Sequence, residues 1–304
     1  MLLYTHPVCL DHLPGPGHPE SPARLRAVLE SLDHDRFATL DRIEAPRASR
    51  AQLARVHTSE MIDHVKSASP GEGFHQLDAD TIMSPDSLEA ALRAAGAVCA
   101  AVDAMIDGSA TRAFCAVRPP GHHATHDTAM GFCLFNNVAV GAAHALSRGL
   151  ERVAIVDFDV HHGNGTQDIF WNDRRVLYAS THQAPLYPGT GAADERGVGN
   201  IVNAPLPPAA SSFGFREACR EIVLPAVERF RPQLVMISAG FDAHYLDPLA
   251  NLNLGTEDYD WITRELVDIA LRHAEGRVVS SLEGGYSLTA LRQSTVAHVA
   301  ALLD

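Results

Sequence analysis

Five short apolar segments, each separated from the next by longer polar or helical stretches, constrain the fold of this chain most strongly. They are rich in β-forming residues and carry few charges, which is typical of strands buried on both faces of a sheet. We predict strands at 111–117, 152–158, 175–180, 232–239 and 276–282, and helices at 85–107, 135–148, 213–230, 256–274 and 287–303. Because strands alternate with helices, the sequence predicts an α/β fold whose parallel sheet has helices on both faces.

The length and composition favour one domain that spans residues 1–304. A chain of this length fits one large α/β unit, and no Pro/Ser-rich linker or repeat divides it. Apolar residues make up 46% and charged residues 20%, which is typical of a globular protein and excludes a disordered or fibrous one.

Composition also limits the surroundings and partners of the protein. The longest uncharged apolar stretch, 94–102, is far shorter than the ~20 residues that span a bilayer. The first residues, "MLLYTHPVCL", resemble no export leader, and five cysteines without paired spacing indicate reduced thiols, so we expect a cytoplasmic protein without membrane contact. The net charge of −13 has no basic cluster to offset it, which disfavours nucleic acid as a direct partner and is compatible with a cationic substrate.

Polar or glycine-rich segments follow four of the predicted strands directly. They read "RPPGHHATH", "DVHHGNG", "GFDAH" and "EGGY" in chain order. Ligands of parallel α/β sheets bind beyond the carboxyl ends of the strands. The sequence therefore predicts one functional site at this edge of the sheet.

The segment "VAIVDFDVHHGNG" (153–165) carries acidic residues and an imidazole at alternate positions. In an extended chain Asp157, Asp159 and His161 would project from the same face. Carboxylates this close to a core are costly unless a positive charge lies between them, so we expect a metal ion, with Asp242 from another strand end as the candidate third ligand. Two carboxylates and one imidazole suit zinc or another divalent transition metal with an open position. The alternative is a pair of capping carboxylates beside a hydrogen-bonded histidine.

Two further segments offer groups for acid–base chemistry. The stiff turn "PPG" (119–121) presents His122 and His123, and either imidazole could serve as general base or acid. Tyr286 follows two glycines and could donate a hydrogen bond to an oxyanion. Phe132 and Tyr187 lie beside glycine turns and could form the walls of a narrow channel, although core packing is the alternative for Phe132.

Six segments together resemble one known family. "RPPGHHA", "GFCLFNN", "DFDVHHGNGTQ", "PGTG", "SAGFDAH" and "LEGGY" are similar to the zinc-dependent histone deacetylases, most of all to the class II branch and its bacterial deacetylase-like amidohydrolases. The resemblance runs from about residue 18 ("HPESPARL") to about residue 290. It implies the three-layer arginase/deacetylase fold, with a mostly parallel central sheet flanked by helices, and the hydrolysis of an acyl amide on an amine side chain.

The resemblance also implies two cation sites. Its zinc ligands would be Asp159, His161 and Asp242. Asp157, which the spacing places among the ligands, would instead orient His122. With Ser180 and the backbone carbonyls of Asp159 and His161, it would hold a structural potassium ion.

The implied mechanism is the attack of a metal-activated water on the amide. The pair His122 and His123 would remove a proton from that water, Tyr286 would donate to the oxyanion, and His123 would protonate the leaving amine. Asn164 occupies the position beside His123 where the class I branch has an acid, so we expect a less basic His123 than in class I. The residues expected to contact substrate are Asp80, Gly131, Phe132, Tyr187 and Leu249.

The residues at a few single positions distinguish this function from its alternatives. A ureohydrolase with two manganese ions would need carboxylates where this chain has Gly163 and His244. An acetylpolyamine amidohydrolase would be expected to carry a Glu where "LDPLAN" has Leu249, so acyl-lysine in a protein or peptide is favoured over an acetylated amine. A catalytically silent binding module is disfavoured because each implied catalytic position holds the expected residue. Bacterial relatives often form dimers or tetramers, which leaves a homo-oligomer open.

Overall fold

The computed structural model describes residues 1–304 and contains one eight-stranded sheet in the order β2-β1-β5-β10-β9-β6-β7-β8. All neighbouring strands in it are parallel. Its strands are β1 (Leu2–Thr5), β2 (Asp41–Glu44), β5 (Arg112–Cys115), β6 (Val153–Asp157), β7 (Val176–Gln183), β8 (Ile201–Leu206), β9 (Leu234–Ala239) and β10 (Val278–Leu282). A small antiparallel pair, β3 (His75–Gln76) and β4 (Ile82–Met83), lies outside this sheet.

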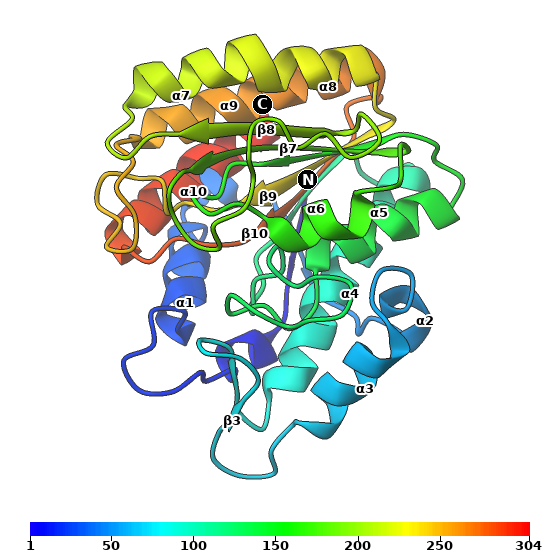
Figure 1. The fold of residues 1–304 in the computed structure, drawn as a ribbon, viewed down its shortest axis with the longest axis vertical. Helices are drawn as coiled ribbons and strands as arrows, with labels where there is room; N and C mark the ends of the chain where they lie inside the picture. Colours follow the sequence, from blue (N-terminus) through cyan, green and yellow to red (C-terminus); the bar gives the residue numbers. More distant parts are fainter.

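Helices cover both faces of the sheet, so the three-layer α/β fold is confirmed (Figure 1). One layer contains α7 (Ser212–Ala218), α8 (Leu224–Phe230), α9 (Thr256–His273) and α10 (Leu288–Leu303). The opposite layer contains α4 (Ser87–Ile106), α5 (Asn137–Ser147) and α6 (Asn164–Phe170). The remaining helices are α1 (Pro22–Ser31), α2 (Arg50–Leu53), α3 (Ser59–Ser67) and the short 3₁₀ turns η1 (Pro7–Leu10) and η2 (Asp35–Phe37).

The helix predicted at 213–230 differs from the expectation in one respect. It is split into α7, a π-helical segment η3 (Cys219–Val223) and α8. Pro225 lies in the first turn of α8 and has no N–H to donate to the preceding turn, so the regular hydrogen-bond ladder cannot pass through this position. The other four predicted helices and all five predicted strands are confirmed within a few residues of their expected ends.

Apolar packing joins the layers in one cluster of 84 buried residues. Every residue of β6, β7, β9 and β10 is buried, as expected for central strands of a parallel sheet. Small residues bring α4 close to its neighbours, because a Cβ at Gly96 would lie 1.9 Å from the carbonyl oxygen of Pro46. None of the helices has the length and apolar character that a membrane span requires.

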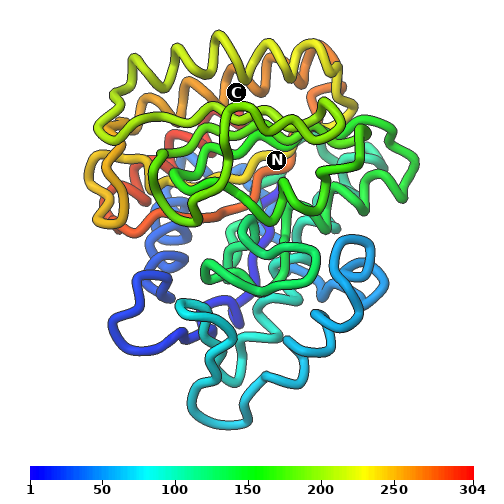
Figure 2. The backbone as a smooth tube through the Cα atoms, viewed as in Figure 1, coloured from blue at the N-terminus to red at the C-terminus, as the bar shows by residue number.

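The chain trace shows how the layers are assembled (Figure 2). Most of the first hundred residues lie in the lower part of the view, and helices α7, α8 and α9 lie at its top. Four strands, β5, β10, β9 and β6, are consecutive in the sheet. Because they are parallel, the polar segments that follow them leave the sheet at the same edge and side by side.

Candidate active site

Strand β6 ends at Asp157, and the chain bends immediately afterwards. The Oδ1 atom of Asp157 accepts the N–H of Asp159 at 3.1 Å, and Oδ1 of Asp159 accepts the N–H of His161 at 2.9 Å. These side chain to backbone bonds form two successive turns, which aspartate favours. The expectation that three alternating side chains share one strand face is therefore wrong, since only Asp157 belongs to the strand.

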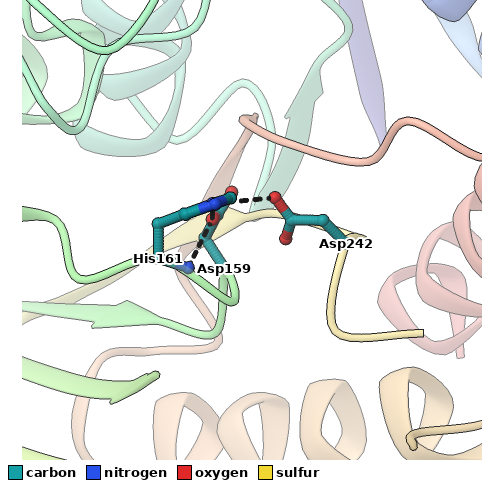
Figure 3. Close-up of side chains that lie close together, drawn as sticks. All are labelled: Asp159, His161 and Asp242. Atoms are coloured by element: carbon teal, nitrogen blue, oxygen red, sulfur yellow. Dashed lines mark hydrogen bonds and ion pairs between the residues drawn. The ribbon is translucent and has the colours of Figure 1, made fainter. Parts of the chain in front are cut away.

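Asp159, His161 and Asp242 come together beyond the ends of β6 and β9 (Figure 3). One potential ligand atom from each lies within 4.8 Å of the others. The Nδ1 atom of His161 is 3.1 Å from Oδ1 of Asp159 and 3.2 Å from Oδ2 of Asp242. The side chains of Asp159 and Asp242 are only 1% and 0% exposed, and that of His161 is 12% exposed. The structure thus brings together the three residues predicted as metal ligands.

The arrangement of oxygen atoms in this triad fits a divalent cation. Asp242 accepts the N–H of Val160 at 2.9 Å through Oδ1, but its buried Oδ2 accepts no hydrogen bond. Glycine keeps the space beside that atom free, because a Cβ at Gly284 would lie 2.1 Å from it and 2.6 Å from Oδ2 of Asp159. An imidazole nitrogen and two carboxylate oxygens are a donor set that zinc and similar ions accept.

The pKa values of the triad residues also indicate that this site favours a cation. Burial raises the pKa of Asp242 to about 7, and the nearby charge of Asp159 adds to the shift. Burial alone would lower the pKa of His161, but its contacts with Asp159 and Asp242 outweigh burial and raise that pKa to about 10. Two buried carboxylates therefore demand positive charge between them, which either a proton or a metal ion can supply.

His122 and His123 lie beside the triad and have different partners. Nδ1 of His122 is 3.0 Å from a carboxylate oxygen of Asp157, whereas Nδ1 of His123 is 2.8 Å from the amide oxygen of Asn164. Their ring centroids are 4.1 Å apart, and that of His123 is 5.9 Å from the ring of His161. The two imidazoles are thus close enough to act on one bound substrate.

The environments of the two imidazoles separate their pKa values. Burial opposes the charged form of His122, but the carboxylates of Asp157 and Asp159 outweigh it and raise its pKa to about 10. Burial, together with the neighbouring His122 and His161, holds the pKa of His123 well below its usual range. Paired groups whose pKa values are pushed apart are suited to acid and base roles.

Tyr286 lies on the loop after β10, close to the same site. Its ring centroid is 6.0 Å from that of Phe132, and the guanidinium of Arg24 lies 4.9 Å over its ring. Its backbone N–H donates to Oδ2 of Asp247 at 2.7 Å. Burial raises the pKa of the Tyr286 hydroxyl well above its usual value, so the phenol keeps its proton and can donate it in a hydrogen bond.

Phe132 and Tyr187 both flank the reactive side chains. The ring of Tyr187 lies 5.1 Å from His123 and 6.3 Å from His161, and Phe132 lies beside Tyr286. Phe132 is partly exposed and has a positive φ of 68°, so the core-packing alternative does not describe it. Both aromatic rings therefore lie next to the side chains of the candidate site.

The other predicted substrate residues lie around this group. Oδ1 of Asp80 accepts the N–H of Gly131 at 3.2 Å. Gly131 itself passes so close to His123 that a Cβ would lie 2.5 Å from the imidazole. Leu249 is 38% exposed, and its N–H donates at 3.0 Å to Asp247, the same carboxylate that accepts from the Tyr286 loop.

Ser180 lies on β7 directly opposite Asp157 on β6. Its hydroxyl is 2.9 Å from Nδ1 of His182, and Asp157 accepts the hydroxyl of Tyr178 at 3.1 Å. The two residues predicted to hold potassium are therefore neighbours across the sheet, with hydrogen-bond partners of their own.

The structure adds a buried acid that the sequence analysis passed over. Glu283, inside the quoted "LEGGY", is 0% exposed. Its Oε2 accepts the N–H groups of Gly121 at 2.7 Å and His122 at 3.2 Å, and its Oε1 is 3.2 Å from the Ser238 hydroxyl. Burial raises the pKa of Glu283 to about 7. The sequence did contain a signal for this residue, because an acid that directly follows a fully buried strand is expected to be buried as well.

A buried ion cluster also supports the Tyr286 loop. Glu20 is bound by Arg24 at 2.9 Å and by Arg118 at 2.7 Å, and all three side chains are 1% exposed or less. Arg24 also donates to the backbone carbonyl of Gly285 at 2.6 Å. The arginines hold the pKa of Glu20 well below its usual value despite its burial. The N-terminal segment thus fixes a loop near the C-terminus.

The fold is a parallel α/β sheet with a buried Asp-His-Asp cluster, a possible metal site, at its carboxyl edge. Residues 18–302 match the model of the histone deacetylase domain. The chain belongs to the histone deacetylase family, as the six segments indicated.

Individual relatives agree with this assignment. A probable deacetylase of Archaeoglobus fulgidus is 40% identical over 98% of this chain and 84% of its own length. The histone deacetylase-like amidohydrolase of Pseudomonas aeruginosa is 44% identical over 89% of this chain and 73% of its own. The crystal structure of the HDA15 HD domain superimposes with a TM-score of 0.94 at 38% identity, covering 99% of this chain and 88% of that one.

Proposed function

We propose that this protein is a zinc-dependent deacylase that hydrolyses the amide of acyl-lysine, most of all acetyl-lysine, in proteins or peptides. The observation that carries the proposal is the placement of two differently paired histidines beside the Asp159, His161 and Asp242 cluster. Membership of the histone deacetylase family supports the same reaction class. Relatives named as deacetylase and amidohydrolase also support it.

Asp159, His161 and Asp242 would hold one zinc ion. When bound, such an ion polarises an amide carbonyl and makes a coordinated water acidic near neutral pH. Oδ2 of Asp242 receives no hydrogen bond and faces Nδ1 of His161 at 3.2 Å, which leaves it available as a ligand atom. Gly284 donates to Oδ2 of Asp159 at 2.8 Å, which fixes the orientation of that carboxylate.

His123 would act first as general base and then as general acid. With a pKa well below neutrality, it is uncharged and able to accept the proton of the attacking water. The protonated ring then returns that proton to the leaving amine. His122, held by the carboxylate of Asp157, would remain the charged partner and stabilise the negative charge that develops on the substrate.

Tyr286 would donate its hydroxyl hydrogen bond to the oxyanion of the tetrahedral intermediate. The raised pKa keeps the phenol protonated near neutral pH. The contacts of Asp247 and Arg24 with its loop hold the backbone before the substrate arrives. A preorganised donor of this kind stabilises the transition state without further reorganisation.

A second, structural cation is part of the proposal. Asp157 and Ser180 face one another across β6 and β7, which supports a potassium ion between them and the carbonyl oxygens of Asp159 and His161. We also infer a cytoplasmic location, because the five cysteines are all buried, unpaired thiols.

Leu249 favours acyl-lysine over acetylated polyamines. It is 38% exposed, and its backbone is tied to the carboxylate that also holds the Tyr286 loop. A carboxylate at this position would pair with the distal amine of a polyamine, but leucine offers apolar contact instead. This contact suits the peptide around a modified lysine.

The substrate class can be tested by direct competition. We expect the zinc-loaded protein to cleave an acetyl-lysine peptide with a kcat/KM at least about tenfold above that for N-acetylputrescine, because a specific pocket contact changes such ratios by this order. Leu249→Glu is expected to move the ratio toward N-acetylputrescine. Cleavage of N-acetylputrescine alone by the unaltered protein would contradict the acyl-lysine assignment.

A further inference from the structure

We propose that Glu283 is a positioning residue that fixes the backbone of the catalytic histidines by accepting the N–H groups of Gly121 and His122. The inference rests on the proposed roles of His122 and His123. Glu283 would act on the backbone turn that carries these imidazoles and would not contact the substrate. The distances are 2.7 Å for Gly121 and 3.2 Å for His122, both to Oε2.

The sequence before the histidines leaves few backbone donors. Pro119 and Pro120 have no N–H, so Gly121 and His122 carry the only backbone donors between Arg118 and His123. Both N–H groups are buried, and both donate to the same oxygen atom, Oε2 of Glu283. No other acceptor contacts either group, so the hydrogen bonding of this turn toward β10 depends on one side chain.

The opposite side of the turn is already fixed. The carbonyl of Pro119 accepts from the side chain of Asn137 at 3.0 Å, and the carbonyl of His122 accepts the N–H of Thr166 at 3.2 Å. A Cβ at Gly121 would lie 2.4 Å from the backbone nitrogen of Asn137, so the turn packs directly on the start of α5. Glu283 therefore completes a clamp, with helices on one side and a strand end on the other.

The location of Glu283 makes it rigid. It follows directly after β10, which lies between β5 and β9, and its own N–H donates to the carbonyl of Ala239 at 2.9 Å. Its backbone carbonyl accepts from Arg24, and its Oε1 contacts the hydroxyl of Ser238. Because the carboxylate is held at the end of β10, its hydrogen bonds fix the turn that follows β5 relative to the sheet.

Burying a carboxyl group costs desolvation free energy, so an acid is unfavourable at a position that only fills space. Carboxyl groups are rarely found in cores unless their oxygens are hydrogen-bonded, and here both oxygens are used. Glutamine could reproduce the geometry, since its oxygen can accept the two amides while its nitrogen donates to Ser238. Alanine could not. The pair of substitutions thus separates acceptance of the two N–H groups from mere filling of space.

The test uses the zinc-loaded full chain with Glu283→Ala and Glu283→Gln. For Glu283→Ala we expect kcat on the acetyl-lysine peptide to fall by on the order of 10²-fold, since small misplacements of catalytic groups have effects of this size. We expect KM to change by less than about threefold, because a group that only places reacting atoms affects turnover rather than binding. Zinc content should stay at the level of the unaltered protein. Glu283→Gln should recover most of the lost kcat.

Hydrogen–deuterium exchange supplies a readout that does not depend on turnover. In the unaltered protein the amides of Gly121 and His122 should exchange slowly, in Glu283→Ala much faster, and in Glu283→Gln slowly again. Asp258→Asn is the matched control. Asp258 is also a fully buried acid that accepts a backbone N–H, from Gly255 at 2.9 Å, but it caps α9 away from the histidines. Its substitution should lower thermal stability and leave kcat and the exchange of residues 119–124 unchanged.

Several results would overturn the inference. A Glu283→Ala variant with unchanged kcat, unchanged exchange at the two amides, or a kcat loss explained entirely by lost zinc would each do so. A Glu283→Gln variant as impaired as Glu283→Ala would also contradict it, and this variant carries the test if the alanine variant does not fold. If the unaltered protein cleaves no acyl-lysine peptide, the proposed function fails, while the exchange of Gly121 and His122 still decides whether Glu283 holds the turn.

Discussion

The variant His123→Ala is expected to lose between about 10²- and 10⁴-fold in kcat on an acetyl-lysine peptide, the range typical of removing a general base or acid. His123 is the neutral member of the pair, and its Nδ1 is fixed at 2.8 Å from Asn164. Removing its ring leaves the water without a proton acceptor and the leaving amine without a donor. Because His123 belongs to no part of the Asp-His-Asp cluster, the metal content should not change.

His126→Ala is the matched control for this prediction. His126 lies three residues further along the same loop, its side chain is 52% exposed, and it pairs with Asp168 at 2.6 Å. Its loss should leave kcat within about twofold of the unaltered enzyme, since it touches none of the reactive groups. Steady-state kinetics and metal analysis on the same preparations provide the comparison. A fully active His123→Ala variant would remove His123 from the mechanism.

Asp242→Ala is expected to release the metal and with it all measurable turnover. The substitution removes the uncommitted Oδ2 and leaves only Asp159 and His161 as ligands. Losing a residue outside a ligand set already weakens metal affinity by roughly 10- to 100-fold, so losing a ligand should have a larger effect. The backbone N–H of Val160 also loses its acceptor, so a modest loss of stability is expected alongside.

Elemental analysis after dialysis measures this effect directly. Asp168→Ala, which removes a carboxylate that is 39% exposed at the surface, serves as the control and should retain the full metal content. Addition of excess zinc should restore little activity to Asp242→Ala, because the missing ligand is part of the site. Full metal occupancy in this variant would show that the ion is held elsewhere.

The central strands were predictable because burial on both faces imposes apolar runs. All residues of β6, β9 and β10 are buried, and each coincides with a predicted segment. The edge strands carry no such pattern. β2 reads "DRIE" and is mostly exposed, and β8 contains Pro205, which lacks a backbone donor. Neither strand has a continuous apolar run, so sequence reasoning missed both. It also missed β1, an inner strand that reads "LLYT" and has only four residues.

The location of the site was predictable from strand ends, but its assembly was not. Alternation along the chain placed Asp157 with Asp159 and His161, whereas the strand ends at Asp157 and the chain turns. Only the strand order β5-β10-β9-β6 brings the histidine pair, Tyr286 and the triad to adjacent positions. A sequence that alternates strands and helices is compatible with many such orders.

Buried residues from distant segments were the least predictable part. Arg24 contacts the carbonyl of Gly285, 261 positions away along the chain, and Glu283 contacts Gly121 at a separation of 162. A glutamate in a sequence is normally interpreted as a surface residue, because acids are rarely buried. Its role becomes visible only when the backbone groups that need an acceptor are known.

Anomalous diffraction at the zinc absorption edge, from crystals of the purified protein, is the most direct measurement of the central claim. We expect a single strong peak at about 2.0–2.2 Å from one carboxylate oxygen each of Asp159 and Asp242 and from a ring nitrogen of His161. A protein that carries no such ion, or whose peak lies away from these three residues, would contradict the account.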